Sequence, residues 1–216
     1  MKKANTRPFT RQRKAIDSLT VEEVEKMLAF VSSVPHLDHS KRNTVLLLLG
    51  VDAGLRLSEM LAIRVKDCWI QGTVVEALTI RDEDAKYGSG RTIDLTHRLR
   101  KALDLWSDVV MGQGYRIDDP FFPGLTCRSN RLSRRQVQNI IAQIGQLSID
   151  KHVTPHQLRH HAATRLLKVT NLKVVQMFLG HRSISTTQVY THPDRVDQKE
   201  AIERRRQSDL SDTTPY

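Results

Sequence analysis

Cysteine is scarce in this sequence of 216 residues, and long hydrophobic runs are missing. Cys68 and Cys127 form neither a disulfide framework nor a CxxC metal motif. We interpret them as reduced thiols, which favours a cytoplasmic protein. The longest apolar run covers residues 45–51 and falls far short of the ~20 residues that span a bilayer, so no membrane association is expected. No apolar segment follows the N-terminal lysines, so secretion is not expected either.

Acidic residues are few relative to basic ones. The chain has 24 Asp and Glu against 34 Lys and Arg, a net charge of +10 and a pI near 9.9. Such a surplus attracts polyanions, above all nucleic acid, because each neutralised phosphate releases counterions. Many soluble proteins are basic for no specific reason, so charge alone gives only moderate support. Residues 1–17 are expected to form a flexible basic arm, either lying on a phosphate backbone or uninvolved.

Helical periodicity dominates the rest of the chain. It predicts helices over residues 21–31, 41–53, 58–63, 96–110, 133–144, 154–168 and 172–179. Three short strands are expected over residues 67–71, 74–80 and 91–95, with a polar turn before the last one. The predicted fold is therefore mainly α with a small antiparallel β-sheet, in the α+β class.

The segment AGLRLSE, residues 53–59, places Arg56 between the end of one helix and the start of the next. A guanidinium at such a junction can bind two non-bridging phosphate oxygens, and Glu59 can hold it in place. The alternative is a surface Arg56 paired with Glu59. Lys86, in the turn of AKYGSGRTIDL, has a flexible stem that can reach a ligand, although a lysine in a turn is usually solvated.

The segment TPHQLRHHAAT, residues 154–164, opens a helix with a capping box and a proline. His156 and Arg159 share one face of its first turns, where backbone N–H groups favour an anion. His156 and His160 also have the spacing of a zinc helix. However, Gln157 replaces the catalytic glutamate, and no further ligand cluster is apparent, so no metal site is expected.

The segment FLGHRSISTTQVYTH, residues 178–192, holds His181 directly after Gly180 and Tyr190 nine residues later. A tyrosine at helical spacing is more often a core or interface residue than a nucleophile. Together, however, the order Arg, Lys, His-x-x-Arg, His, Tyr resembles the tyrosine recombinases, the phage integrase family. GLRLSEMLAI, TPHQLRHHAAT and LGHRSISTTQVYTH resemble the signature boxes of that family, over roughly residues 15–195. Asp94 stands where the hairpin box usually has a proline.

The resemblance implies an enzyme that cleaves and rejoins DNA. By this resemblance Arg56 and Arg159 bind the scissile phosphate and Tyr190 attacks it, which gives a 3′-phosphotyrosine and a free 5′-hydroxyl. The implied general base is His156, the implied general acid is Lys86, and His181 donates a hydrogen bond to the phosphate. The covalent intermediate conserves the energy of the phosphodiester, so no cofactor is expected, and the motif GxxxxGK[ST] is absent.

The expected partner is double-stranded DNA with a specific recombination site. The resemblance implies a homo-tetramer that works through a Holliday junction, with possible accessory directionality proteins and a nucleoid-associated location. We expect a catalytic domain over residues 18–195 and a tail over residues 196–216 that docks on a neighbouring protomer. Many members have a separate N-terminal helical domain, and this sequence has almost nothing before Ser18, so we expect either a short, single-domain member or an isolated catalytic fragment.

Further basic and polar residues gather around the helix that begins at residue 133. The arginines around its cap are expected to contact the DNA backbone without reading sequence. The helix can also enter the major groove, where base edges can be reached by Arg134, Arg135, Gln138 or Asn139. A solvated helical face is nearly as good an interpretation. The candidate DNA-binding residues are Arg128, Arg131, Arg134, Arg135, Gln138 and Asn139.

Two rival functions remain open. A type IB topoisomerase-like enzyme uses the same phosphotyrosine chemistry to relax DNA as a monomer and never exchanges strands. A regulator that kept the fold binds DNA without cutting it, although all six catalytic positions are filled here. A covalent protein–DNA adduct separates the regulator from both enzymes.

Overall fold

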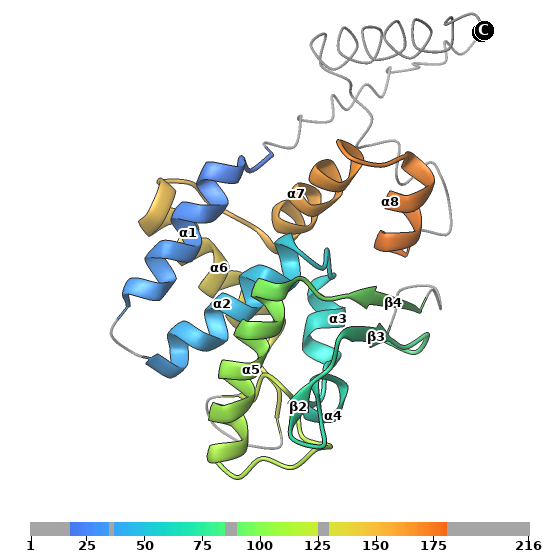
Figure 1. The fold of residues 1–216 in the computed structure, drawn as a ribbon. Helices are drawn as coiled ribbons and strands as arrows, with labels where there is room; N and C mark the ends of the chain where they lie inside the picture. Colours follow the sequence, from blue (N-terminus) through green and yellow to red (C-terminus); the bar gives the residue numbers. More distant parts are fainter. Residues whose placement is uncertain (1–17, 35–36, 85–89, 125–129, 181–216) are drawn as a thin grey trace, which may run out of the picture.

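The computed structural model describes residues 18–34, 37–84, 90–124 and 130–180 (Figure 1). Helices form most of this part of the chain, and four short strands form two antiparallel pairs. The elements in chain order are α1 Val21–Ser33, α2 Leu37–Val51, α3 Leu57–Ala62, α4 Val65–Cys68, β1 Trp69–Ile70, β2 Thr73–Val74, β3 Ala77–Ile80, β4 Arg91–Asp94, α5 His97–Gly112, α6 Arg134–Ile149, α7 Pro155–Leu167 and α8 Leu172–Leu179. The mainly α fold with small antiparallel sheets is therefore confirmed.

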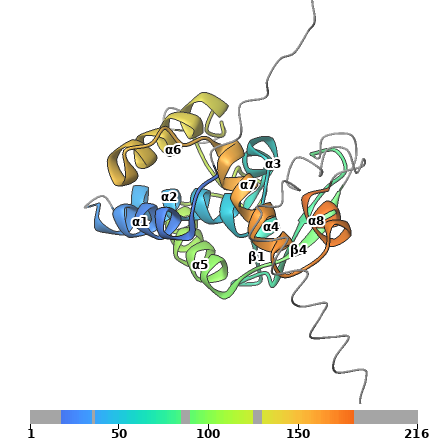
Figure 2. The same ribbon diagram turned by 90° about the horizontal axis from the view of Figure 1, so that it is seen from above.

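Helix α2 forms the centre of the core. Residues 45–49 are all buried, with at most 3% of any residue exposed, so the C-terminal half of this helix is apolar on every side. It packs against α1, α5, α6 and α7, which surround it in Figures 1 and 2. Among the described helices, none is long and apolar enough to cross a membrane.

Local capping sets the helix starts, as the sequence predicts. Thr20 with Glu23, Ser133 with Gln136, and Thr154 with Gln157 each form a complete capping box. Helix α6 continues to Ile149, five residues beyond the prediction, because Gly145 does not end it: this glycine is buried inside the helix against Val153, and the left-handed cap is Asp150. Helix α2 begins four residues earlier than predicted.

The prediction of one three-stranded sheet is wrong. Residues 65–68 form helix α4, because the Asp67 carboxylate accepts a 2.8 Å hydrogen bond from the backbone N–H of Arg64 and caps a helical turn. Strands β1 and β2 then form a separate hairpin. Its turn residues Gln71 and Gly72 both have positive φ, as a tight two-residue turn requires.

Strands β3 and β4 form the hairpin that the sequence predicts. Leu78 pairs with Ile93 and Ile80 pairs with Arg91, and the apolar members of these pairs are buried. Because side chains alternate along a strand, Arg91 points to the same face as Ile93, the face toward the core. This hairpin lies beside α3, and β4 contacts α8 (Figures 1 and 2).

Close contact between α2 and α7 generates a first prediction. A Cβ at Gly50 of α2 would lie 2.7 Å from Cβ of Leu158 on α7, whereas a Cβ at Gly112 of α5 would meet nothing within 4 Å. Overpacking at such a contact costs about 1–3 kcal/mol. We expect Gly50→Ala to lower the free energy of unfolding by that amount in urea titrations. Gly112→Ala, the matched control, should leave it unchanged or raise it by up to about 1 kcal/mol. Equal effects of the two substitutions would contradict this account of the packing.

Candidate active site

A buried carboxylate lies at the centre of the candidate site. Glu59 is in the first turn of α3, and its side chain is 0% exposed. Its Oε2 accepts a 2.8 Å hydrogen bond from the backbone N–H of Arg56, the N-cap of the same helix, and its Oε1 accepts one of 2.7 Å from Arg56 Nη1. The predicted Arg56–Glu59 contact is therefore confirmed, with the Arg56 side chain 21% exposed and Glu59 fully enclosed.

Two further arginines reach the same carboxylate from distant parts of the chain. Arg91 of β4 makes a bidentate contact with the Glu59 carboxylate, in which Nη1 donates to Oε1 at 3.1 Å and Nη2 donates to Oε2 at 3.0 Å. Arg159 of α7 forms an ion pair, with Nη1 3.7 Å from Oε2. Arg56, Arg91 and Arg159 with Glu59 are called the arginine cluster below.

The electrostatics of the arginine cluster favour an added anion. Burial alone would raise the pKa of Glu59, but the hydrogen bonds and charge of Arg91, followed by the hydrogen bonds from Arg56, hold it below the usual value. Glu59 is therefore ionised at neutral pH. Three guanidinium groups then share one negative charge, which leaves a local surplus of positive charge that suits a phosphodiester.

The end of α8 is bound to the same cluster. Arg91 Nε donates to the carbonyl oxygen of Phe178 at 2.6 Å, Arg159 Nη2 to that of Leu179 at 2.7 Å, and Arg56 Nη2 to that of Gly180 at 3.3 Å. Three consecutive carbonyls at the negative end of a helix thus each accept from a different arginine. The chain beyond Gly180, which carries His181 and Tyr190, starts at the arginine cluster.

Helix α7 presents His156 at its N-terminal end. Pro155 is its first residue and His156, which is exposed, shares a face with Arg159. Although the residue as a whole is exposed, the protein around its ring partly desolvates the imidazolium, and this desolvation, followed by the positive charge of Arg159, lowers the pKa of His156 below 6.5. Its imidazole is therefore mainly neutral at pH 7 and has a nitrogen that can accept a proton.

The two other histidines of α7 are buried and face the protein. His161 Nδ1 lies 2.8 Å from the carbonyl oxygen of Leu19, so this nitrogen carries the proton, because a carbonyl can only accept. His160 Nδ1 lies 3.3 Å from Thr164 Oγ1. Within the described ranges, no three His, Cys, Asp or Glu side chains gather as metal ligands would.

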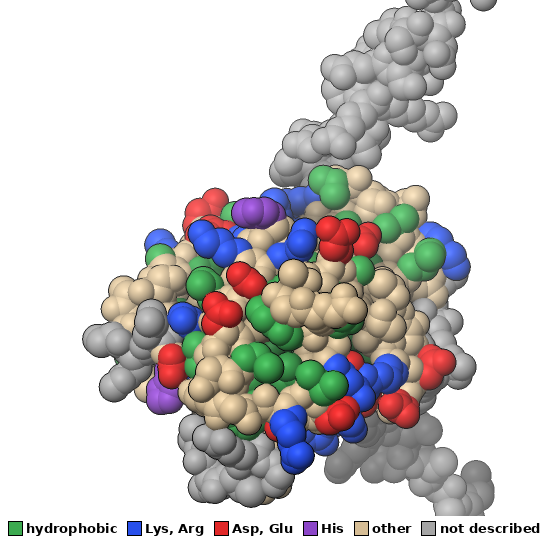
Figure 3. Space-filling model, turned by 60° about the horizontal axis from the view of Figure 1, so that its bottom comes forward, with side chains coloured by type: hydrophobic (Ala, Val, Ile, Leu, Met, Phe, Trp, Pro, Cys, Tyr) green, Lys and Arg blue, Asp and Glu red, His purple; other side chains and the backbone are tan. Residues whose placement is uncertain are grey.

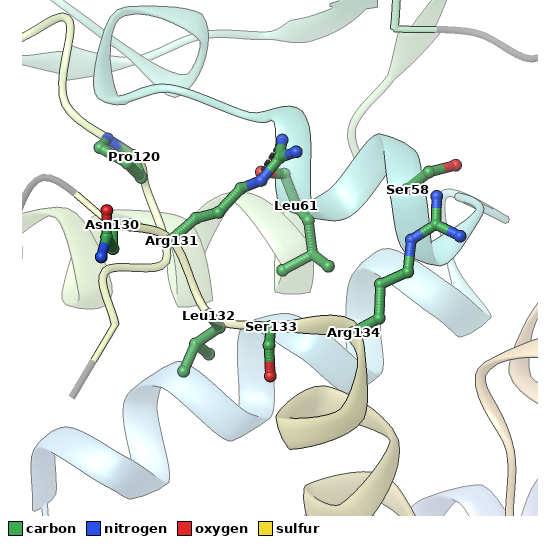
Figure 4. A pocket seen from close by; sticks show the side chains of 8 residues that line it. All are labelled: Ser58, Leu61, Pro120, Asn130, Arg131, Leu132, Ser133 and Arg134. Atoms are coloured by element: carbon green, nitrogen blue, oxygen red, sulfur yellow. Dashed lines mark hydrogen bonds between the residues drawn. The ribbon is translucent and has the colours of Figure 1, made fainter. Parts of the chain in front are cut away.

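A second group of predicted residues lies next to α3. Arg131, Arg134, Arg135, Gln138 and Asn139 are all exposed. An open pocket of about 610 Å³ lies between the start of α6 and α3, and its lining includes Ser58, Leu61, Arg131 and Arg134. Figure 4 shows the Arg134 side chain extending toward Ser58, while Arg131 Nη1 donates to the carbonyl oxygen of Leu61 at 3.3 Å. Helix α3 therefore contributes to both places, with Ser58 and Leu61 lining the pocket and Glu59 at the centre of the arginine cluster.

Four predicted site residues lie outside the described residues, namely Lys86, Arg128, His181 and Tyr190. Arg91 is a site residue that sequence reasoning missed. A signal was present, because strand alternation puts this charge on the same face as Ile93, and a buried charge requires a partner. The face of the molecule in Figure 3 carries Lys and Arg side chains interspersed with Asp and Glu, without a field of one sign.

Removing the charge of Glu59 should destabilise the fold strongly. Glu59→Gln leaves buried guanidinium groups without their anion, and breaking a buried pair costs roughly 3–5 kcal/mol. The exposed Glu25, which binds Arg98, is the control, and Glu25→Gln should cost about 0–1 kcal/mol. Urea titrations at pH 7 measure both differences.

The pH dependence of the free energy of unfolding, compared between wild type and Glu59→Gln, tests whether the charge of Glu59 provides this stabilisation. Because the pKa of Glu59 is lowered in the folded state, its stabilisation is complete above the unfolded value of about 4.3 and is lost as the pH falls through the lower folded value. The difference in stability between wild type and Glu59→Gln should therefore begin to narrow as the pH falls below about 4.3 and go on narrowing until the pH has passed the lower folded pKa of Glu59. A constant difference from pH 7 to pH 3 would mean that the charge of Glu59 is not what stabilises the cluster.

A family profile and individual relatives both match this chain to tyrosine recombinases. The phage integrase family profile matches residues 17–196. Tyrosine recombinase XerC of Pseudomonas entomophila is 34% identical over 156 residues, covering 72% of this chain and 49% of the relative. XerC of Vibrio vulnificus is 33% identical over 181 residues, covering 82% of this chain and 53% of the relative. The chain thus spans about half the length of these relatives.

Solved structures agree on the fold. The XerA recombinase superposes with a TM-score of 0.73 at 24% identity, over 93% of this chain and 67% of that one. The XerH site-specific recombinase, in a post-cleavage complex with its palindromic difH substrate, gives a TM-score of 0.68 at 26% identity, over 88% of this chain and 53% of that one. With the matched boxes and the arginine cluster, these results establish that the chain belongs to the phage integrase family of tyrosine recombinases.

Proposed function

We propose that this protein is a site-specific DNA recombinase that cleaves and rejoins double-stranded DNA through a 3′-phosphotyrosine. One observation carries the proposal: Arg56 and Arg159, from two helices, converge on one buried carboxylate at the point where the chain toward Tyr190 begins. A phosphodiester resists nucleophiles because of its own charge, and paired guanidinium groups remove that obstacle. No part of this chemistry requires a cofactor or a metal ion.

Each candidate residue has a distinct role in the proposed cleavage step. Arg56 and Arg159 bind the non-bridging oxygens, and Tyr190 Oη attacks phosphorus as His156 accepts its proton. The bond from phosphorus to the 5′-oxygen breaks, and Lys86 gives a proton to that oxygen. The lowered pKa of His156 supports its role, since the free tyrosine pKa of about 10 calls for a neutral base nearby. His181 stabilises the charge on the phosphate.

Rejoining is the reverse of this step. A 5′-hydroxyl attacks the phosphotyrosine, and the tyrosine leaves with its proton restored. The energy of the original bond is retained in the covalent intermediate, so ATP is not consumed. If the attacking 5′-hydroxyl comes from a second duplex, the strands are exchanged.

The DNA partner, the domain boundaries, the oligomeric state and the cellular location are part of the same proposal. XerH is a recombinase solved on its difH substrate, which supports a DNA partner with a specific site for this chain. We propose residues 18–195 as the catalytic domain, residues 1–17 as a basic arm and residues 196–216 as a tail that docks on a neighbour in a homo-tetramer. Accessory proteins would set the direction of exchange, and the reaction would take place on the nucleoid in the cytoplasm.

Covalent capture tests the reaction on every sequence of a genome at once. The chain is incubated with lightly nicked genomic DNA of its host, denatured, and recovered with any DNA that stays attached. A nick beside the cleaved bond lets the 5′-hydroxyl fragment diffuse away, so the adduct accumulates. We expect sequencing of the recovered DNA to show one site enriched for wild type and none for Tyr190→Phe.

The outcomes of this experiment separate the candidate functions. Adducts scattered over all sequences, with relaxation of supercoiled DNA and no strand exchange, would indicate a topoisomerase-like enzyme. Site-specific binding without any adduct would indicate a regulator. Either result overturns the recombinase proposal, as does an adduct that survives in Tyr190→Phe.

Helix α6 generates a separate prediction about DNA recognition. Arg134 and Arg135 at its start would bind phosphates, and Gln138 and Asn139 one turn later would read base edges. Replacing both polar residues by Ala should change which sequences are captured, at about 1–3 kcal/mol per lost bidentate contact. Replacing both arginines by Gln should instead weaken binding to all sequences and reduce its salt dependence. Unaltered site preference after the Gln138 and Asn139 substitutions would count against base reading by α6.

A further inference from the structure

Arg91 differs from Arg56 in how it is bound, whereas Arg159 is enclosed as Arg91 is, with 4% of its side chain exposed. The Arg91 side chain is 7% exposed, and its guanidinium donates in three directions: Nε to Phe178, Nη1 to Glu59 Oε1 and Nη2 to Glu59 Oε2. All three nitrogens therefore donate to protein oxygens. A DNA phosphate would have to displace one of these bonds to reach Arg91.

Arg56 is arranged differently. It is three times as exposed, at 21%, and its bond to the carbonyl of Gly180 is long, at 3.3 Å. Nη2 of Arg56 can therefore turn to a phosphate at little cost, while its Nη1 keeps the bond to Glu59. Of these two guanidinium groups, that of Arg56 can exchange a partner, whereas that of Arg91 is held by protein oxygens at all three nitrogens.

We propose that Arg91 is a positioning residue for the DNA cleavage reaction, because it joins β4, the carboxylate of α3 and the C-terminal end of α8 through one rigid group. This inference rests on the proposed function for the reaction that it serves. By fixing both oxygens of Glu59, Arg91 sets the direction in which Arg56 and Arg159 are held. By binding the Phe178 carbonyl, it fixes the backbone from which the segment with His181 and Tyr190 departs.

The planar fork of arginine is needed for this role. A single guanidinium bridges the two carboxylate oxygens and a backbone carbonyl at once, whereas a lysine offers one ammonium group that cannot span all three. Loss of the fork leaves Glu59 with Arg56 and Arg159 only and leaves the Phe178 carbonyl without its donor from β4. Small displacements of groups that position a reacting phosphate cost about 100-fold in rate.

Two variants with a matched control test the proposal by kinetics. Arg91→Gln removes the charge and the fork, and Arg91→Lys keeps the charge alone. The matched control is Arg81→Gln. Arg81 lies beside the same hairpin, but it binds Asp67 and not Glu59. The substrate is a nicked duplex that carries a site recovered in the covalent-capture experiment. For each variant we measure the rate of adduct formation at saturating DNA, the dissociation constant for DNA and the thermal unfolding midpoint.

We expect Arg91→Gln to lower the saturated adduct rate about 100-fold with less than about a threefold change in the dissociation constant. Arg91→Lys should fold as wild type does and recover only part of the rate. Arg81→Gln should keep the wild-type rate. An Arg91→Lys protein with the full wild-type rate, or a loss confined to DNA affinity, would overturn the proposal.

A second readout does not depend on activity. In ¹⁵N-arginine-labelled protein without DNA, the Nε–H signals of Arg56 and Arg159 should shift or broaden in Arg91→Lys and stay unchanged in Arg81→Gln. If wild type forms no adduct, the proposed function fails and this spectrum alone decides whether Arg91 positions the cluster. Unchanged Arg56 and Arg159 signals in Arg91→Lys would overturn the inference even if wild type cleaves DNA.

Discussion

A single buried carboxylate organises this molecule. Glu59 is fully enclosed, and a charge in such a place is tolerated only when it is paired and hydrogen-bonded. Its partners come from α3 itself, from β4 and from α7, so these elements must come together before the charge is satisfied. The same requirement gathers three guanidinium groups at one point, and the resulting surplus of positive charge is what a phosphodiester needs. Stability and the proposed chemistry thus depend on the same contacts.

The helical core holds these partners in place. The apolar C-terminal half of α2 is the surface against which α7 packs, and the absence of a side chain at Gly50 lets Leu158 approach closely. That packing fixes Arg159, the next residue along α7, whose guanidinium binds the carbonyls of Gly54 and Leu179. The end of α8 is thereby attached to the site, and the chain toward the proposed nucleophile departs from there.

Most of the fold could be predicted from the sequence because its determinants are local. Capping boxes at Thr20, Ser133 and Thr154 and apolar periodicity mark the helices, and spaced motifs identify Arg56 and Arg159. The strand prediction at Asp67 is wrong because the short apolar run over residues 68–70, which favours a strand, follows a carboxylate that caps a helical turn. Strand alternation signals that Arg91 faces the core, but its partners could not be predicted, since they lie 32 and 87 residues away and only tertiary packing joins them.

The central claim is that Arg56 and Arg159, held by Glu59, bind the phosphate that Tyr190 attacks. The most direct measurement is a crystal structure of the chain on a captured, nicked site with orthovanadate, which adopts the five-coordinate geometry of phosphoryl transfer. The account predicts vanadium between Tyr190 Oη and the 5′-oxygen, with both guanidinium groups on its equatorial oxygens and the Glu59–Arg91 contact retained. Vanadate bound away from Arg56 and Arg159, or joined to a residue other than Tyr190, would contradict it.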